Sequence, residues 1–287
     1  DESESRGLGD VYKRQVIGNP IEHSLSPQIH QEFAAQTGEL LTYEKVKVEL
    51  TGFADFLKDF ADSGGKGLNI TVPFKVEAFN GATQLHELAD IANAVNTLSI
   101  EGADIIGFNT DGLGFIRDLT QRHGVQLAGK SVLVLGAGGA CRGIIEPLLG
   151  TNPAQVTIAN RTLANAQALY GLFSGRHGHN SLSCVDLSVL AEGNAGTYDL
   201  VVNTTSLGLS ADGITLPASL AQGSFCYDMN YGDKAAFARW AEEQGALNSV
   251  DGLGMLVEQA AESFNIWRGV RPKTDEIYQS LRKRVGV

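Results

Sequence analysis

A lysine and an aspartate stand where α/β proteins often carry out chemistry. A strand pattern over residues 69–72 runs into Pro73, and Lys75 follows just beyond it. Asp111 follows a second apolar segment around residues 105 and 106. Ligand crevices in α/β sheets lie beyond the carboxyl ends of the strands. Held together there, the two side chains would keep an ammonium group charged beside a carbonyl oxygen that gains negative charge during hydride attack.

Both residues also have a simpler interpretation. A single lysine is most often a solvated surface side chain. Asp111 would equally serve to cap a helix that the pattern predicts over residues 113–123. The residues alone do not decide whether Asp111 caps a helix or takes part in catalysis.

Two serines precede the first predicted helix. Ser26 has the position of an N-cap, Pro27 that of the first helical residue, and Gly38 that of the C-terminal stop. Ser24 is not explained by this cap, and two hydroxyls beside a helix N-terminus could bind a small carboxylate. The anion site and the plain cap are about equally supported here.

A glycine-rich turn indicates a bound dinucleotide. The apolar run 132–135 has the composition of a buried parallel strand, and Gly136 and Gly138 follow where the chain must turn close to a pyrophosphate. A helix that begins near Gly139 would direct its first amides at that anion. Cys141 replaces the third glycine of the usual motif, so the glycines acquire weight only from their setting between strand and helix.

The end of the next strand indicates which dinucleotide is bound. An NAD site would carry an acid there to hold the ribose 2′-hydroxyl, whereas this strand ends in Asn160, Arg161 and Thr162. A guanidinium group can donate two parallel hydrogen bonds to a phosphate. The pattern therefore favours NADP, and the alternative is an ordinary surface arginine at the start of a helix.

Other kinds of catalytic site are not supported. His23 and His30 complete no metal-ligand set, and packing is the expected role of His30. There is no G-x-S-x-G elbow, and Cys141 directly follows the phosphate loop. We expect no metal, and hydride transfer through a cofactor is the simplest chemistry.

Strand and helix patterns alternate along the chain, which predicts an α/β fold with mostly parallel strands. The dinucleotide unit begins only near Gly112, so the first half must supply something else, most simply substrate binding. The predicted elements are strands at 43–48, 67–72, 199–204 and 224–228 and helices at 52–62, 85–92 and 253–267.

Composition limits the partners. The chain has 287 residues with 33 acidic and 22 basic side chains, a formal charge of −11, and no long basic run, which disfavours nucleic acid and acidic membranes. Three dispersed cysteines favour a reducing compartment, the cytoplasm. No apolar stretch approaches the roughly 20 residues that span a bilayer. Residues 1–15 lack an initiating methionine and join abruptly to Val16, so we predict a non-native leader or a mistranslated junction.

With these motifs in view, the chain resembles the shikimate dehydrogenase family of the bacterial aromatic amino acid pathway from about Val16 onward. Each motif alone is unspecific, but together and in this order they are highly specific. The motifs are HSLSP at 23–27, NITVPFK at 69–75, AVNT at 94–97, NTDG at 109–112, GAGGA at 136–140, NRT at 160–162, YDM at 227–229 and GLGMLVEQ at 252–259.

The resemblance implies a substrate domain over residues 16–111 and 251–287, a Rossmann-type doubly wound NADP domain over 112–250, and a cleft where the two meet. It implies Lys75 and Asp111 as the catalytic pair. Substrate would be held by Ser24, Ser26 and Tyr231 at its carboxylate and by Thr71, Asn96 and Gln259 at its ring hydroxyls. Cofactor would be held by Gly136, Ala137, Gly138, Gly139, Ala140, Asn160, Arg161, Thr162, Asn203, Thr204, Thr205, Gly254 and Met255, the last two against the nicotinamide.

The implied activity is the reversible NADPH-dependent reduction of 3-dehydroshikimate to shikimate in chorismate biosynthesis, by a monomer or homodimer. Three residues depart from the family pattern: Gln31, Cys141 and Asn165. Asn165 stands where a second basic residue often supports the 2′-phosphate, so a weaker preference for NADP is expected. The alternatives are a quinate/shikimate dehydrogenase with relaxed cofactor use and a regulatory protein that binds shikimate or nucleotide without turnover.

Overall fold

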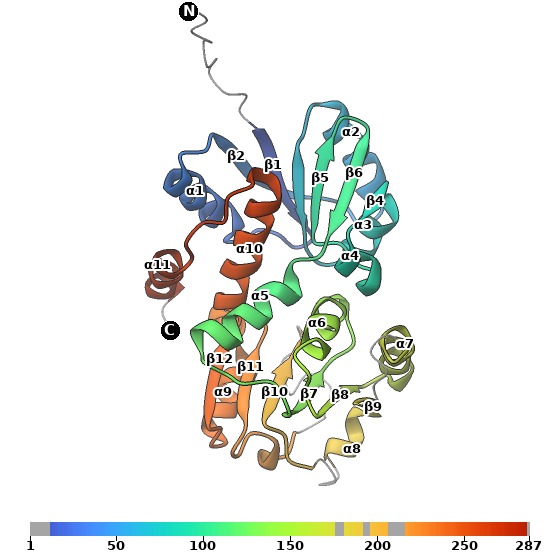
Figure 1. The fold of residues 1–287 in the computed structure, drawn as a ribbon, viewed down its shortest axis with the longest axis vertical. Helices are drawn as coiled ribbons and strands as arrows, with labels where there is room; N and C mark the ends of the chain where they lie inside the picture. The colour runs from blue at the N-terminus through green and yellow to red at the C-terminus, as the bar shows by residue number, and fades with distance from the viewer. Residues whose placement is uncertain (1–11, 176–180, 192–195, 206–215, 286–287) are drawn as a thin grey trace, which may run out of the picture. The chain divides into compact units, whose positions relative to one another are not determined.

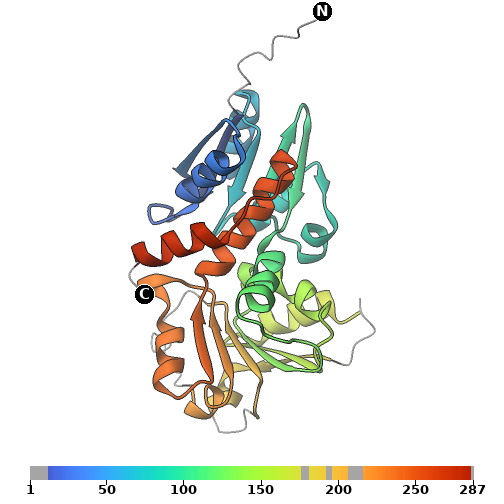
Figure 2. The same cartoon turned by 60° about the vertical axis from the view of Figure 1, so that its left-hand side comes forward.

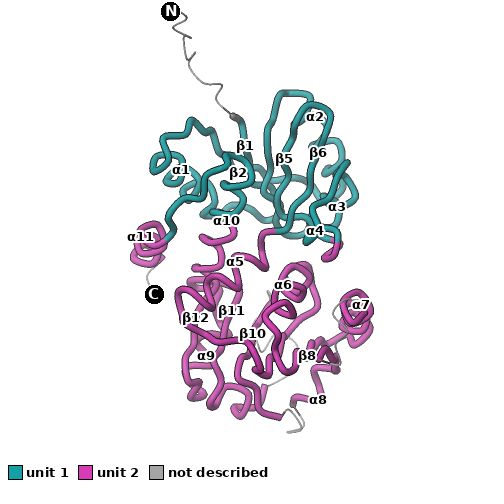
Figure 3. The backbone as a smooth tube through the Cα atoms, in the orientation of Figure 1, with its two compact units in different colours: residues 1–90, 94–109, 260–274 teal, residues 91–93, 110–259, 275–287 magenta. Residues whose placement is uncertain are grey.

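The strands form two six-stranded sheets. The computed structural model describes residues 12–175, 181–191, 196–205 and 216–285. The chain divides into two compact units (Figure 3). Unit 1 comprises residues 1–90, 94–109 and 260–274, and unit 2 comprises 91–93, 110–259 and 275–287.

The first sheet belongs to unit 1 and is mixed (Figure 1). Its strand order is β2-β1-β3-β5-β6-β4, with β5 antiparallel to β3 and to β6 and the other pairs parallel. The elements are β1 Tyr12–Gly18, α1 Ser26–Thr37, β2 Leu41–Lys47, α2 Phe53–Asp62, β3 Gly67–Ile70, α3 Lys75–Gly81, β4 Gln84–Leu85, α4 Glu87–Ala92, β5 Thr97–Glu101 and β6 Asp104–Phe108.

The second sheet, in unit 2, is parallel throughout, with strand order β12-β11-β10-β7-β8-β9. Read from β9, this is the order of a doubly wound dinucleotide fold. The elements are α5 Asp111–Arg117, η1 Asp118–Arg122, β7 Ser131–Leu135, α6 Gly139–Leu149, β8 Gln155–Asn160, α7 Leu163–Phe173, β9 Leu182–Asp186, α8 Leu187–Ala191, β10 Leu200–Asn203, η2 Ala218–Leu220, β11 Phe225–Asp228, η3 Gly232–Lys234, α9 Ala236–Glu243, β12 Asn248–Asp251, α10 Leu253–Arg268 and α11 Asp275–Val285.

Both faces of the second sheet are covered because its central strands are apolar on both sides. Val132 and Val134 of β7 pack into the core that contains α5, α6 and α7, while Leu133 and Leu135 pack into the core that contains α9. Figure 2 shows α9 and α6 on opposite sides of this sheet. The predicted α/β class with a doubly wound second half is therefore confirmed.

Several boundaries differ from those expected. β1 starts at Tyr12, inside the segment predicted as a leader, because residues 12–18 pair with β2 and residues 14–17 also pair with β3. Arg14 and Gln15 are buried there. Residues 1–11 lie outside the described residues. Residues 275–287 group with unit 2, since Arg282 of α11 binds Asp251 at 2.6 and 2.9 Å.

The helix predicted over 113–123 begins two residues earlier and changes type partway. α5 covers Asp111–Arg117, and a π-helical turn covers Asp118–Arg122. Asp118 is fully buried and accepts a hydrogen bond from Arg122 at 2.9 Å. The wider turn thus coincides with a buried carboxylate.

Candidate active site

In unit 1, residues predicted to bind substrate lie where the central strands of the sheet end. β3 ends at Ile70, and the backbone amide of Ile70 donates to the carbonyl oxygen of Asn96 at 2.8 Å. β5 runs antiparallel to β3, so Asn96, which precedes β5, and Thr71, which follows β3, lie at the same edge. Thr71 is held there by a bond from its amide to the carbonyl of Ile17 at 2.9 Å.

Lys75 is the first residue of α3 and is partly buried. Its carbonyl oxygen accepts the amide of Val95 at 2.9 Å, which ties the start of α3 to the residue next to Asn96. The backbone segments that carry Lys75, Thr71 and Asn96 therefore lie near one another at this end of the strands.

Ser26 is not the N-cap that its position suggested. α1 begins at Ser26 itself, with Leu25 at the capping position, and Gly38 ends the helix in the left-handed region at φ 72°. The amide of Ser26 bonds to the hydroxyl oxygen of Ser24 at 3.3 Å, so Ser24 takes over part of the capping. Both serines lie at the helix N-terminus, where a carboxylate would be stabilised.

In unit 2, Asp111 is the first residue of α5, with Thr110 at the capping position, so Asp111 is not the cap that one interpretation made it. It is buried. Gly112 explains how α5 packs so close to α6, because a Cβ there would overlap the carbonyl of Gly143 and the ring of Pro147. The glycine after Asp111 thus fixes the helix that carries the carboxylate.

The glycine turn after β7 has the backbone features expected of a phosphate-binding turn. Gly136 has φ +105°, and a Cβ there would lie 2.6 Å from the hydroxyl of Thr204. Gly138 has open space around its missing Cβ, and α6 begins at the next residue. These residues form a cradle of the kind that a nucleotide phosphate occupies at a helix N-terminus.

The segment after β10 lies beside this cradle because β10 pairs with β7. The amide and the hydroxyl of Thr204 bond to the carbonyl of Leu135 at 2.9 and 2.8 Å. Asn203 accepts the amide and the hydroxyl of Thr205 at 3.1 and 2.7 Å. The predicted segment Asn203–Thr205 therefore holds its shape through its own side chains and borders the glycine turn.

The predicted 2′-phosphate residues follow β8. Asn160 ends the strand and donates to the carbonyl of Thr162 at 2.9 Å, while Arg161 is exposed between them. Asn160 pairs in register with Asp186 of β9, whose carboxylate accepts the amide and hydroxyl of Ser188 at 2.9 and 2.7 Å. These hydrogen bonds lower the pKa of Asp186. The strand end that would hold a ribose in an NAD enzyme carries an amide instead of an acid.

The remaining predicted residues of unit 2 lie on or near α10. Gly254 and Met255 form its first turn, and both are buried. Gln259 accepts from the hydroxyl of Thr110 at 3.4 Å. Tyr231 is partly buried, and burial raises the pKa of its phenol.

Sequence reasoning missed two buried polar networks. One lies under α10, where Asp118 accepts from the phenol of Tyr227 at 2.7 Å and Arg122 bridges to Glu258 at 3.2 Å. The other, in unit 1, joins Tyr43, Asn69, Thr97, Ser263 and Asn96. A signal for the first was available, since Asp118 interrupts the otherwise apolar stripe of Phe115 and Leu119.

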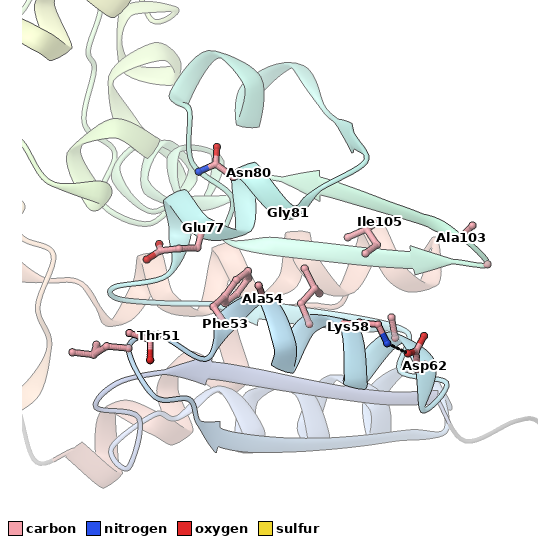
Figure 4. A pocket seen from close by; sticks show the side chains of 14 residues that line it. Thr51, Phe53, Ala54, Lys58, Asp62, Glu77, Asn80, Gly81, Ala103 and Ile105 are labelled. Carbon is pink, nitrogen blue, oxygen red and sulfur yellow. Dashed lines mark hydrogen bonds and ion pairs between the residues drawn. The ribbon is translucent and has the colours of Figure 1, made fainter.

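A pocket of about 760 Å³ lies elsewhere in unit 1 (Figure 4). Its floor includes Phe53 and Leu57 of α2, and Glu77 of α3 and the β5–β6 turn line it. None of its lining residues is a predicted site residue. Within the described residues no group of three His, Cys, Asp or Glu side chains could hold a metal, and no helix there is long and apolar enough to cross a membrane.

The chain matches known families along most of its length. Residues 16–98 match the shikimate dehydrogenase substrate binding domain, 118–207 the shikimate / quinate 5-dehydrogenase family, and 252–282 the shikimate 5′-dehydrogenase C-terminal domain.

A relative from Alkalilimnicola ehrlichii, named shikimate dehydrogenase (NADP(+)), is 52% identical over 93% of this chain and 97% of its own length. The crystal structure of an Ael1 enzyme from Pseudomonas putida is 41% identical, with a TM-score of 0.84 over 94% of this chain and 98% of that one. Shikimate 5-dehydrogenase from Thermus thermophilus, solved with NADP(H) and shikimate, is 30% identical, with a TM-score of 0.81 over 95% of this chain and 99% of that one. On this identity and coverage, the chain belongs to the shikimate dehydrogenase family.

Proposed function

We propose that Lys75 and Asp111 perform the proton transfer of an NADP-dependent shikimate dehydrogenase, the activity of the family to which the chain belongs. The reaction is the reversible reduction of 3-dehydroshikimate to shikimate. Lys75 and Asp111 are proposed from the motifs NITVPFK and NTDG, and the assignment of NADP is carried by the cradle at Gly136, followed at the next strand end by Arg161 and no acid. That combination fits a nucleotide with a 2′-phosphate.

NADPH, when bound by these residues, would supply a hydride for the ring carbonyl carbon. As that bond forms, the carbonyl π electrons move to the oxygen, and the Lys75 ammonium donates a proton to it. Asp111 would orient the Lys75 ammonium toward that oxygen. In the oxidation of shikimate the neutral amine takes the hydroxyl proton back, so the same pair serves both directions.

The ligand residues complete the proposal. Ser24, Ser26 and Tyr231 would hold the substrate carboxylate, with the N-terminus of α1 contributing its dipole. Thr71, Asn96 and Gln259 would hold ring hydroxyls, which orients the reacting carbonyl. The pyrophosphate would be held by Gly136, Ala137, Gly138, Gly139 and Ala140, and the 2′-phosphate side by Asn160, Arg161 and Thr162. Gly254 and Met255 would lie against the nicotinamide, and the segment Asn203, Thr204 and Thr205 would pass under the cofactor.

The test is the Lys75→Ala variant, assayed by absorbance of the reduced nicotinamide with shikimate and NADP. A positioned general acid contributes about 10²- to 10⁴-fold, so kcat should fall on that scale. The Kd for shikimate, measured by calorimetry, should change little. Lys58→Ala is the matched control, since Lys58 is exposed on α2 and pairs with exposed Asp62. Near-normal turnover of Lys75→Ala would contradict the assigned role.

A second substrate calls for a parallel assay because residues 118–207 match a family described for both shikimate and quinate. Quinate with NADP and with NAD should give little signal if the enzyme is specific for shikimate. Binding of shikimate without turnover of any pair would instead support a regulatory protein.

We also infer a cytoplasmic monomer or homodimer. Free Cys141, Cys184 and Cys226 among the described residues are compatible with a reducing compartment. Light scattering of the purified protein decides between the two oligomeric states.

A further inference from the structure

Five buried polar side chains form a connected cluster inside unit 1. Asn69 of β3 lies opposite Thr97 of β5 in the antiparallel pair, and Tyr43 comes from β2. Ser263 comes from the second half of α10, and Asn96 directly precedes β5. All five are at least 93% buried, so their hydrogen bonds form away from water, where an unmatched group is costly.

The hydrogen bonds of the cluster run in one direction. The phenol of Tyr43 donates to Oδ1 of Asn69 at 2.6 Å. Nδ2 of Asn69 then donates to the hydroxyl oxygens of Thr97 and Ser263 at 3.1 and 3.0 Å. The hydroxyl of Thr97 donates to Oδ1 of Asn96 at 2.9 Å.

This arrangement also determines which hydroxyl donates in the hydrogen bond between Thr97 and Ser263. Thr97 has a single hydroxyl proton, and it is used on Asn96. Ser263, which lies 2.7 Å from Thr97, must therefore be the donor in that pair. The chain of donors ends at the amide oxygen of Asn96.

Tyr43, the first donor of this hydrogen-bonded cluster, also forms a hydrogen bond with Ser26. Burial raises the pKa of the Tyr43 phenol well above its usual value, and a hydrogen bond with Ser26 opposes this rise. The Tyr43 ring stacks on His30 with centroids 4.3 Å apart and an interplanar angle of 9°. The ring is thus fixed in place between α1 and β3.

We infer that Tyr43, Asn69 and Thr97 are positioning residues that fix the amide orientation of Asn96, with its oxygen toward Thr97 and its NH2 group as the end that can donate to substrate. The inference rests on the proposed function, in which Asn96 holds a ring hydroxyl. It assigns a role to three residues that need not touch the substrate. It also links Asn96 to Ser26, the residues proposed for opposite parts of the ligand.

The test compares Thr97→Val with Thr97→Ser. Valine keeps the shape of threonine but cannot donate to Asn96, so its amide loses the preference for one orientation. We expect the Kd and KM for shikimate to rise about tenfold, the scale of one lost hydrogen bond, with kcat changed less. Serine restores the donor and should return both constants to nearly their original values. Tyr43→Phe, which removes the first donor, should raise Kd by a smaller factor.

A double-mutant cycle separates positioning from general destabilisation. In an Asn96→Ala background there is no amide to orient, so Thr97→Val should cause no further rise in Kd. Thr157→Val is the matched control, because Thr157 is a buried strand threonine that bonds to Ser183 at 3.1 Å in unit 2. It should leave the Kd for shikimate unchanged.

An unchanged Kd for Thr97→Val, or an equal rise in the Asn96→Ala background, overturns the inference. Calorimetry with shikimate alone keeps the two proposals distinguishable, since it needs no turnover. Wild-type protein that neither binds nor oxidises shikimate contradicts the proposed function. Wild-type protein that does both, with Thr97→Val unaffected, contradicts only the positioning role.

Discussion

Arg161 is the residue that we propose to read the 2′-phosphate of the cofactor. It follows the last residue of β8, where its exposed side chain can reach a phosphate at little desolvation cost. Asn160 replaces the acid that would repel that phosphate. Asn165, in the first turn of α7, supplies no second positive charge. On the proposed assignment, selectivity for NADP would rely on a single guanidinium group.

Replacing this residue should change selectivity more than turnover. Arg161→Ala should raise the KM for NADP by about 10- to 100-fold, consistent with about 1.5–3 kcal/mol for a hydrogen bond to a charged group, and leave the KM for NAD nearly unchanged. The measurement is kcat/KM for both cofactors at fixed shikimate and ionic strength. Arg284→Ala, an exposed change on α11, is the control. An equal loss with NAD and NADP would show that Arg161 does not read the 2′-phosphate.

His30 is a buried ionisable side chain, and the proposed function gives it no role that requires a charge. Burial, and to a lesser extent the charge of Arg14, lowers its pKa to about 3. Its ring lies among Tyr43, Phe33 and Trp267. The prediction that His30 packs instead of binding metal agrees with these contacts.

The depressed pKa has a definite consequence for stability. Unfolded His30 would bind a proton below about pH 6.5, whereas folded His30 does so only near pH 3. Its contribution is therefore fully present above pH 6.5 and is lost as the pH falls toward 3, by up to about 1.4 kcal/mol per pH unit. His30→Phe should weaken this dependence between about pH 6.5 and about pH 4.5. Urea unfolding of both proteins measures it, and parallel pH curves would contradict the assignment.

At the scale of elements, the first turn of α10 depends on two carboxylates. Asp251 accepts the amide of Leu253 at 3.2 Å and is clamped by Arg282 of α11. Asp118 lies so close to Gly254 that any Cβ there would overlap its carboxylate. Burial raises the pKa of Asp118, while bonds from Tyr227 and Arg122 oppose the rise. Asp251 and Asp118 therefore fix the first turn of α10, which is proposed to face the nicotinamide.

Gly254→Ala should therefore be far more harmful than an average helix substitution. Overpacking of this kind costs about 1–3 kcal/mol, and the displaced turn should raise the KM for NADP. Gly171→Ala is the matched control, because Gly171 lies in helix α7 with open space around it and should gain about 0.5–1 kcal/mol. Thermal unfolding and the KM for NADP test both variants. If Gly254→Ala behaved like Gly171→Ala, the close approach of Asp118 would not matter.

The sequence predicted elements best where a local pattern determines them. The apolar run of β7 and the glycines after it give the strand, turn and helix directly, since Gly136 must adopt a positive φ. The pattern predicts Ser26 as the N-cap, but Ser26 is the first helical residue and Ser24 shares the capping. The turn at Asp118 follows from contacts with Tyr227 of β11 and Arg122, and local pattern carries little information about a partner 109 residues away.

At the scale of the whole molecule, alternation of strands and helices predicted the parallel sheet of unit 2 well. It predicted the first sheet less well, because the antiparallel β5–β6 pair depends on cross-strand partners such as Thr97 and Phe108. Motifs predicted the candidate site residues, but they did not predict the hydrogen-bond networks beside them. Asn69 was part of a recognised motif, yet its bonds to Tyr43 and Ser263 join strand and helix residues from distant parts of the chain.

The three cysteines offer a measure of how unit 2 opens as a whole. Burial raises the pKa of Cys141 and of Cys226 to about 12, and both side chains are fully buried. Cys184 is only partly buried on β9. In the folded protein a thiol reagent should therefore react first with Cys184, while the other two react only when unit 2 opens.

Bound NADP should slow that opening reaction. If the opening that exposes Cys141 also disrupts the adjacent phosphate cradle, NADP at about 100 times its Kd should slow labelling about 100-fold, equivalent to about 2.7 kcal/mol. The measurement is the labelling rate of Cys184→Ser, which leaves only the two buried thiols, followed by mass spectrometry with and without NADP. Denatured protein should label both sites rapidly. A labelling rate that ignores NADP would mean that the cysteines become exposed through a local motion that leaves the cofactor site intact, and unit 2 would then not open as one cooperative body.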